Sequence, residues 1–368
     1  MTVPAPVLIM AGGTGGHVFP ALAVARALRE RSESVIWLGT EKGLEARVVP
    51  ADGFPLEFVR VSGLRRKGFL SLVIAPFKLF LAVWAALKLI RRLRPKVVLG
   101  MGGFASGPGG LAAWLLRRPL VIHEQNAAAG LTNRLLARVA SEVLQAFPNA
   151  FAGKVAVRTI GNPVRSDIFN LPAPDVRISA EPGPLHLLVL GGSQGALVLN
   201  ETVPQAVSLL QSAGMNVDVW HQSGVSTLDA AKHAYQDAGV TARIEPFIEA
   251  MNSAYGWADL VVCRAGALTI AELAAAGVGS ILVPYPSAVD DHQTCNAMFM
   301  VDAEAAVLMP QSELNPESLA AQLEHFATDR QLLITTALNA KAQAQPDATA
   351  NLMLACLNAS LPKEAAKQ

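Results

Sequence analysis

The stretch VLIMAGGTGGHVFPALAVARALRE, residues 7–30, decides the fold. A short apolar run leads into a glycine turn, and an amphipathic stretch follows. About 180 residues later, LHLLVLGGSQGALVLNETVPQAVSLLQ at 185–211 repeats the same order. Each segment is typical of the first strand, glycine turn and helix of a doubly wound domain. Because similar strand and helix patterns alternate along the chain, we predict an α/β protein with two Rossmann-like, parallel-sheet domains that face a cleft.

The length of 368 residues suits two domains. A Gly- and Pro-rich stretch, GNPVR at 161–165, is followed by LPAPD and EPGP and indicates a linker. We therefore expect one domain at 1–163 and a second at 164–346. A last helix at 347–362 could pack on either domain and is expected to join the first.

Composition excludes several classes of protein. Hydrophobic residues make up 52% and charged residues 16%, which is unlike a disordered, collagen-like or coiled-coil chain. The three cysteines are odd in number and lack metal-type spacing, so neither a disulfide framework nor a zinc site is expected. The N-terminal residues lack the basic region of a signal peptide, and we expect a protein of the reducing cytosol.

The net charge of +1 conceals two unlike halves. Residues 1–163 carry +13, whereas residues 164–368 carry −12. Between Glu57 and Glu124 no acidic residue occurs, although twelve basic residues do. This asymmetry predicts that the first half meets an anionic surface, either a membrane or a nucleic acid.

The apolar segment FLSLVIAPFKLFLAVWAALKLI at 69–90 is flanked by basic residues. We expect Pro76 to break it, leaving a helix of about 14 residues, short of the ~20 that cross a membrane. We also expect a basic arc on this helix, from Lys78 to Arg92, with a separate apolar face. The helix either docks on a membrane or is buried against its own sheet with its lysines snorkelling outward; the acid-free flanks favour the membrane. The predicted membrane-binding residues are Phe77, Lys78, Phe80, Leu81, Trp84 and Lys88.

The two glycine turns have two interpretations. Neither fits GxGxxG, and neither has a Walker lysine. Their N–H groups suit an anion at the positive end of a helix, but glycines also supply the positive φ of a tight turn. His17 follows the first turn at a helix start, whose partial positive charge favours a neutral imidazole. It is a candidate proton acceptor, and a structural histidine is the alternative.

Polar side chains gather after three other apolar runs. His123, Glu124, Gln125 and Asn126 follow PLVI, where a parallel sheet binds ligands, although Glu and Asn also cap loops.

Gly266 and Ala267 indicate a helix start suited to a diphosphate, with Glu272 as a ribose partner or a capping-box residue. After SILVPY come Asp290, Asp291, His292, Gln293 and Asn296, which offer partners for sugar hydroxyls and no metal site.

Twelve strings follow one another along the chain: AGGTGGHVFPALAVA, WLGT, SGLRRKG, VLGMGGFASGPGGLAAW, HEQN, AGLTN, QAFP, GNPVR, GGSQGA, WHQSG, VVCRAGALTIAEL and HQTCNA. In their order and content they resemble the MurG family of glycosyltransferases almost from end to end. The resemblance implies the GT-B fold and an inverting transfer of N-acetylglucosamine from UDP-N-acetylglucosamine. The acceptor would be the C4 hydroxyl of the muramyl sugar of undecaprenyl-diphospho-muramyl-pentapeptide, in peptidoglycan biosynthesis, on which cell shape and division depend.

The resemblance also implies partners and a location. It implies no metal, no other cofactor and no nucleic acid. The protein would attach peripherally to an anionic membrane surface at the cytoplasmic face of the inner membrane, with cell-wall synthesis proteins among its partners.

Carried over position by position, the resemblance makes His17 the general base. Ser193 would contact the nucleotide, the backbone of Ile248 would bind the uracil, and Gln293 would bind sugar hydroxyls. The full set implied for the donor is Thr14, Gly15, Gly16, Asn126, Arg165, Ser193, Ile248, Ala267, Leu268, Thr269, Ile270, Ala271, Glu272 and Gln293. Phe104 and His292 depart from the family's usual Tyr and Gln, which leaves details of sugar recognition open.

Other functions remain to be weighed. The nearest is another GT-B transferase acting on a membrane lipid such as diacylglycerol, against which HEQN and HQTCNA argue. A nucleotide-sugar epimerase would have no use for the basic, apolar segment at 60–96. A non-catalytic membrane-associated binding protein would tolerate the loss of His17. A nucleic-acid protein fits the basic half, but the aliphatic content of that half suits lipid better.

Overall fold

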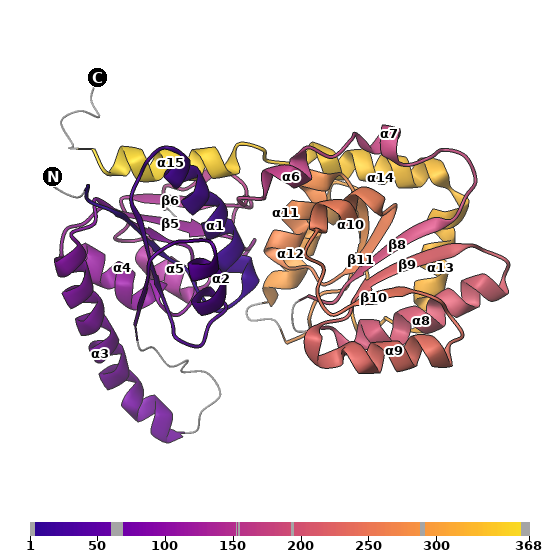
Figure 1. Ribbon diagram of the computed structural model, residues 1–368, viewed down its shortest axis with the longest axis horizontal. Coiled ribbons are helices and arrows are strands. Elements are labelled where there is room, and N and C mark those ends of the chain that lie inside the picture. The colour runs from indigo at the N-terminus through magenta and orange to yellow at the C-terminus, as the bar shows by residue number, and fades with distance from the viewer. Residues whose placement is uncertain are drawn as a thin grey trace. The chain divides into compact units, whose positions relative to one another are not determined.

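The computed structural model describes residues 4–59, 69–151, 153, 155–192, 195–287 and 291–361, with the side chains of all of these except 69–75. The chain divides into two compact units (Figure 1). Unit 1 comprises Met1–Val164 and Asp347–Gln368, and unit 2 comprises Arg165–Pro346. The two units are described separately below.

Unit 1 is built on a seven-stranded parallel sheet of order β3-β2-β1-β4-β5-β6-β7. Its strands are β1 (Val7–Met10), β2 (Val35–Gly39), β3 (Leu56–Phe58), β4 (Val97–Gly100), β5 (Leu120–Glu124), β6 (Glu142–Gln145) and β7 (Arg158–Thr159). Its helices are α1 (Gly15–Glu30), α2 (Glu45–Ala51), α3 (Phe69–Leu93), α4 (Ser106–Leu115), α5 (Leu131–Leu136) and α15 (Ala348–Ala359).

The side chains of β1 alternate between two apolar layers. Val7 and Ile9 pack in a core cluster with residues of α1 and α15. Leu8 and Met10 face the opposite cluster, which includes residues of α3 and α4. Because both faces of the sheet are covered, the strand is continuously apolar, as the sequence shows. The C-terminal α15 lies beside α1 in Figure 1, although the two helices are more than three hundred residues apart.

Unit 2 repeats this plan with a six-stranded parallel sheet of order β10-β9-β8-β11-β12-β13. Its strands are β8 (Leu185–Leu190), β9 (Val217–Gln222), β10 (Arg243–Glu245), β11 (Leu260–Cys263), β12 (Gly279–Leu282) and β13 (Ala306–Leu308). Its helices are α6 (Ser166–Phe169), α7 (Pro174–Arg177), α8 (Leu197–Ser212), η1 (Val225–Thr227), α9 (Leu228–Asp237), α10 (Met251–Trp257), α11 (Ala267–Ala276), α12 (His292–Val301), α13 (Pro316–Thr328) and α14 (Arg330–Ala342). The prediction of two Rossmann-like parallel sheets is confirmed.

Helix α3 differs from its prediction in two ways. First, it runs through Pro76 as one helix of 25 residues, so the predicted break was wrong. A proline inside a helix removes one N–H···O bond, and the rest of a long helix retains its own bonds. Within the described part of the chain, no helix meets the length and apolarity needed to cross a membrane.

Second, the predicted separation of a basic arc from an apolar face on α3 was wrong. Trp84 and Lys88 are one turn apart and share a face, and Lys88 Nζ lies 3.4 Å from the centroid of the Trp84 ring. The buried face carries Ala82, Ala86 and Ile90, which recur every four residues. Five large apolar side chains between residues 77 and 84 are exposed instead: Phe77, Leu79, Phe80, Leu81 and Trp84. The alternative of a helix buried against its own sheet therefore holds for this one face, whereas the aromatic side chains remain exposed.

Candidate active site

In unit 1, the predicted base His17 stands in the first turn of α1, at the carboxyl end of β1. Thr14 is the N-cap of this helix, and Gly15 and Gly16 are its first two residues. His17 Nδ1 lies 3.0 Å from Oε1 of Gln125, which directly follows β5. The sheet order places β1, β4 and β5 side by side, so the ends of these strands meet as expected for a ligand site.

Behind Gln125 lies a fully buried histidine. His123 Nε2 is 2.9 Å from the carbonyl oxygen of Gly161. Burial lowers the pKa of His123 to about 4, with a smaller contribution in the same direction from His17; the bond to Gly161 opposes this shift. His123 is therefore neutral at pH 7.

The first glycine turn is held by a carboxylate that the sequence did not single out. Buried Glu45, at the start of α2, accepts hydrogen bonds from Gly13 N (2.9 Å), Thr40 N (2.8 Å) and Thr40 Oγ1 (2.7 Å). Gly13 has φ +96°, a conformation that favours glycine. The tight-turn interpretation therefore holds at Gly13, whose N–H binds the protein's own carboxylate.

The cluster after β5 is partly a loop cap. Glu124 Oε1 accepts from the backbone N and the Nδ2 of Asn126 at 3.0 and 3.1 Å. Its Oε2 accepts from Gly130 N and Asn133 Nδ2 at 3.2 and 2.8 Å. The structure thus bears out the capping interpretation for Glu124, and this cap orients Asn126.

The glycine turn of unit 2 shows similar constraints. Gly192 and Gly195 have φ of +78° and +82°. A side chain at Gly195 would collide with Thr227 Oγ1 and the carbonyl oxygen of Ser223, so the chain needs glycine there. Ser193, predicted to contact the nucleotide, lies outside the described residues, and so does Asp290.

The predicted helix start at the carboxyl end of β11 is confirmed. Gly266 is the N-cap of α11, and Ala267 is its first residue. Leu268, Thr269, Ile270 and Ala271 follow in the first turns, and Ile270 is buried. The first N–H groups of a helix lack intrahelical partners, so this end of α11 is suited to an anion.

Glu272 belongs to the second turn of α11. The capping-box alternative is wrong, because Glu272 is six residues beyond the N-cap and its Oε2 accepts from Tyr255 Oη at 3.1 Å. Burial raises the pKa of Glu272 to about 7, and the positive charge of Arg165 opposes this rise. Arg165 is the N-cap of α6 and belongs to the same unit. Glu272 therefore changes its charge near neutral pH.

Two further predicted donor residues already have partners within unit 2. The backbone N of buried Ile248 donates to Gln222 Oε1 at 3.0 Å. A base recognised by this N–H would displace the Gln222 amide oxygen. Gln293, in the first turn of α12, accepts from Tyr285 N at 2.9 Å. Asn296 Nδ2 donates to the carbonyl oxygen of Ala265, which ties α12 to the loop before α11.

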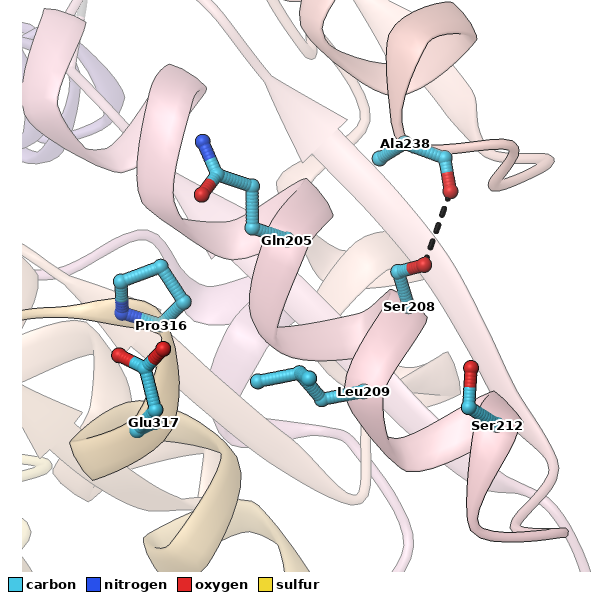
Figure 2. A pocket seen from close by; sticks show the side chains of 7 residues that line it. All are labelled: Gln205, Ser208, Leu209, Ser212, Ala238, Pro316 and Glu317. Carbon is cyan, nitrogen blue, oxygen red and sulfur yellow. Dashed lines mark hydrogen bonds between the residues drawn. The ribbon is translucent and has the colours of Figure 1, made fainter.

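Two further features of the described residues bear on possible ligand sites. Among the described residues, no three His, Cys, Asp or Glu side chains are grouped so as to hold a metal ion. A shallow pocket lies at the far end of α8 from the glycine turn, and its Ser208 Oγ donates to the carbonyl oxygen of Ala238 at 2.9 Å (Figure 2). The residues that line it are Gln205, Ser208, Leu209, Ser212, Ala238, Pro316 and Glu317.

Two residues that shape these sites, Glu45 and Tyr255, were not predicted from the sequence. Gln125 was predicted together with its neighbours after PLVI, without a connection to His17. GLE at 43–45 follows the WLGT string and was a signal for Glu45. Nothing in the sequence indicated that Tyr255 meets Glu272, because the two lie on different helices.

The chain matches known proteins over nearly all its length. Residues 7–145 match the glycosyltransferase family 28 N-terminal domain, and residues 186–352 match the C-terminal domain of that family. A relative from Marinobacter nauticus, named UDP-N-acetylglucosamine–N-acetylmuramyl-(pentapeptide) pyrophosphoryl-undecaprenol N-acetylglucosamine transferase, is 54% identical over 353 residues, which cover 96% of this chain and 97% of the relative. A relative of the same name from Nitrosococcus oceani is 56% identical over 335 residues, with coverage of 91% and 93%.

Solved structures agree. The crystal structure of MurG from Acinetobacter baumannii superposes with a TM-score of 0.83 at 42% identity, covering 96% of this chain and all of that one. The calicheamicin glycosyltransferase CalG4 has a TM-score of 0.68 at 18% identity, which shows a shared fold alone. The predicted GT-B class is confirmed.

Proposed function

The chain belongs to glycosyltransferase family 28, and on that premise we propose that it transfers N-acetylglucosamine from UDP-N-acetylglucosamine to a lipid-linked muramyl-pentapeptide. The acceptor is the C4 hydroxyl of the muramyl sugar of undecaprenyl-diphospho-muramyl-pentapeptide. The product is the disaccharide lipid that peptidoglycan synthesis consumes, which links the enzyme to cell shape and division. The observation that carries the proposal is His17, oriented by Gln125 at the meeting of three strand ends, in a chain more than half identical to relatives of that name.

We assign the proton transfer to unit 1. A sugar hydroxyl is a weak nucleophile near neutral pH, so a base must take its proton as the oxygen attacks C1 of N-acetylglucosamine. His17 takes this proton. The C4 oxygen bonds to C1 from the face opposite the UDP, the bond from C1 to the diphosphate oxygen breaks, and the α linkage becomes β. Thr14, Gly15 and Gly16 lie beside the base at the start of α1, and Asn126 is oriented by Glu124 near Gln125.

We assign the donor to unit 2. The start of α11, from Ala267 to Ala271, stabilises the charge that grows on the departing UDP. Glu272 accepts hydrogen bonds from the ribose diol, and Arg165 balances its charge. Gln293 contacts the transferred sugar, Ile248 the uracil, and Ser193 the nucleotide.

We propose that the reaction needs neither a metal ion nor another cofactor. The partial positive charge at the start of α11 and the Arg165 guanidinium supply positive charge near the donor site of unit 2 without one. Transfer that survives EDTA is the expected result.

The membrane partner is proposed from the exposed face of α3. Phe80 is 64% exposed and Trp84 49%, and Lys88 shares the face of Trp84. Helix α4, which packs against α3, adds exposed Trp114 and Leu115, and α5, which packs against α4, adds exposed Leu131 and Leu135. Apolar side chains beside Lys and Arg suit an anionic lipid surface. We place the enzyme at the cytoplasmic face of the inner membrane, with cell-wall synthesis proteins as neighbours and no nucleic acid as a ligand.

Vesicle sedimentation tests the membrane proposal. A Phe80→Ser/Trp84→Ser variant should bind vesicles containing phosphatidylglycerol at least tenfold more weakly than wild type, because each buried aromatic side chain contributes about 1.5–3 kcal/mol. Leu338→Ser, which removes an exposed leucine from α14 in unit 2, is the matched control and should bind as wild type does. Equal binding by the α3 variant would reject this surface.

Transfer of radiolabelled N-acetylglucosamine tests the reaction itself. The enzyme receives the muramyl-pentapeptide diphosphate lipid and, in parallel, diacylglycerol, each with and without EDTA. Label in the muramyl lipid alone is the expected result. Label in diacylglycerol alone would make this a glycolipid synthase, the alternative within the same fold.

A further inference from the structure

Gln125 lies between two histidines in the buried interior of unit 1. Its Oε1 is 3.0 Å from Nδ1 of His17, and its Nε2 is 3.3 Å from Nδ1 of His123. Gln125 and His123 are both buried. The last group in this chain of contacts determines which nitrogen atoms along it carry protons.

That end is the carbonyl oxygen of Gly161, which only accepts hydrogen bonds. His123 Nε2, at 2.9 Å, must therefore carry a proton and donate it. Because burial keeps His123 neutral at pH 7, its second nitrogen, Nδ1, has a lone pair and accepts.

The orientation of the Gln125 amide is determined by the atoms around its nitrogen. Three atoms surround its Nε2, and each of them accepts: His123 Nδ1 at 3.3 Å, the carbonyl oxygen of His123 at 3.3 Å and Met101 Sδ at 3.9 Å. The amide nitrogen belongs on this side, so the amide oxygen faces His17. An amide oxygen only accepts, and His17 Nδ1 must therefore donate.

We propose that Gln125 is a positioning residue that holds neutral His17 in the tautomer with the proton on Nδ1, so that Nε2 carries the lone pair that takes the acceptor's proton. The consequence for catalysis rests on the proposed function. The tautomer itself does not, because it follows from the contacts of Gly161, His123 and Gln125.

The backbone around this chain keeps its members in place. A Cβ at Gly102 would come within 2.8 Å of both Cε1 and Nδ1 of His17, so glycine leaves room for the ring. Gly161 has φ +83°, which favours glycine, and the next residue, Asn162, donates from Nδ2 to the carbonyl oxygen of Gln125 at 3.0 Å. The GNP segment thus holds both His123 and Gln125.

Nitrogen NMR of the full-length protein tests the tautomer without any substrate. Long-range ¹H–¹⁵N correlations of protein labelled with ¹⁵N-histidine, at a pH where His17 is neutral, report which ring nitrogen is protonated; a His17→Asn variant assigns the resonance. Wild type should show protonated Nδ1 and bare Nε2. A bare Nδ1 in the wild type would overturn the proposal.

Two substitutions separate positioning from structural support. Gln125→Met keeps the length of the side chain but removes the acceptor, so the Nδ1–H preference of His17 should be lost. Gln125→Glu keeps an oxygen facing His17, and its second oxygen, which meets only acceptors, takes up a proton and donates to them; the variant should retain that preference. Gln145→Met is the matched control, because Gln145 is also buried, ends the neighbouring strand β6 and bonds to Thr159 Oγ1 instead. It should leave His17 unchanged.

Kinetics then connects the tautomer to turnover. Gln125→Met should lower kcat about tenfold to a hundredfold with the donor KM unchanged, whereas Gln145→Met should not. Equal kcat for these two variants, with active wild type, would overturn the positioning role. If wild type transfers no sugar, the proposed function fails while the NMR result still decides the tautomer. If Gln125→Met does not fold, a wild-type tautomer in Gln125→Glu supports the proposal and a changed one rejects it.

Discussion

The two units share a strand order over six strands but differ in the carboxyl groups at their candidate sites. Unit 1 surrounds its buried carboxylates with donors: Glu45 accepts three hydrogen bonds and Glu124 accepts four. Each unit also contains a buried histidine whose pKa burial lowers: His123 in unit 1, to about 4, and His221 in unit 2, to about 3. In unit 2, the Glu272 carboxyl has its pKa raised by burial to about 7, so its charge changes with small changes of pH.

This difference is consistent with one fold serving two proposed tasks, proton transfer in unit 1 and donor binding in unit 2. A neutral histidine whose proton position is set by its neighbours suits the proton transfer that we propose for unit 1. A carboxyl near its titration point suits a unit that binds and releases a ligand. The first half is also basic and the second acidic, at +13 and −12, which fits the proposed anionic lipid partner of the first half and the proposed nucleotide-sugar ligand of the second. Substitutions in each unit test this division.

The largest expected effect comes from His17→Ala. Removing a general base lowers the rate of the catalysed step by about 10²–10⁴-fold, and we expect kcat to fall about 10³-fold. UDP-N-acetylglucosamine affinity, measured by calorimetry, should not change, because we assign the donor to unit 2. His233→Ala removes an exposed histidine from α9 and is the control. Unchanged turnover of the folded His17→Ala protein would show that another group is the base.

Glu272→Ala should lower the affinity for the donor, whereas His17→Ala should lower turnover. Hydrogen bonds to a charged group contribute about 1.5–3 kcal/mol, so affinity for UDP-N-acetylglucosamine should fall about tenfold to a hundredfold. Saturating donor should restore most of the turnover. Glu272→Gln, which keeps an acceptor for Tyr255, should lose less. An unchanged dissociation constant for the alanine variant would remove Glu272 from the donor site.

Glu45→Gln tests whether the carboxylate of unit 1 is structural. An amide directs an NH₂ group at one of the N–H or O–H donors that now meet oxygen, and we expect a loss of about 2 kcal/mol in the free energy of unfolding. Urea unfolding measures it. Glu324→Gln, on the exposed surface of α13, should leave stability within experimental error. Similar curves for both variants would contradict the role of Glu45.

The pH dependence of donor binding should be the smallest effect. The pKa of Glu272 is raised to about 7, so the carboxyl gains a proton as the pH falls below 7 and then accepts ribose hydrogen bonds less well. The dissociation constant of UDP-N-acetylglucosamine should rise by less than about tenfold in total as the pH falls from 8 to 5.5, and it should level off above about pH 8. Calorimetry between pH 5.5 and 8.5 measures this. Glu272→Gln should give a flat profile, and an equally steep one would assign the titration to another group.

Much of the architecture could be predicted because it follows from local patterns. Apolar runs of four to six residues indicated β1 and β8, and a glycine turn before an amphipathic stretch indicated α1 and α8. The start of α11 followed from Gly266 and the small residues after it. The polar cluster after β5 was expected at a strand end because parallel strands end at the same edge of a sheet.

Helix α3 marks the limit of such patterns. Composition indicated an apolar, basic helix, but neither its length nor its faces were predicted correctly. The side chains of Ala82, Ala86 and Ile90 are buried, and the larger Phe80 and Trp84 remain exposed. Which face of a helix is buried depends on the surface it packs against, and here a face of small side chains packs against the rest of unit 1.

The sequence by itself determined the family, the two doubly wound units and the residue types at their strand ends, because periodicity and turn chemistry are local. The tertiary structure decided which atoms meet. Gln125 contacts His17, which is 108 residues away, Glu45 binds a glycine turn 32 residues before it, and Tyr255 reaches Glu272 from another helix. These contacts depend on strand order and helix packing. They also determine where protons and charges lie, which no spacing along the chain specifies.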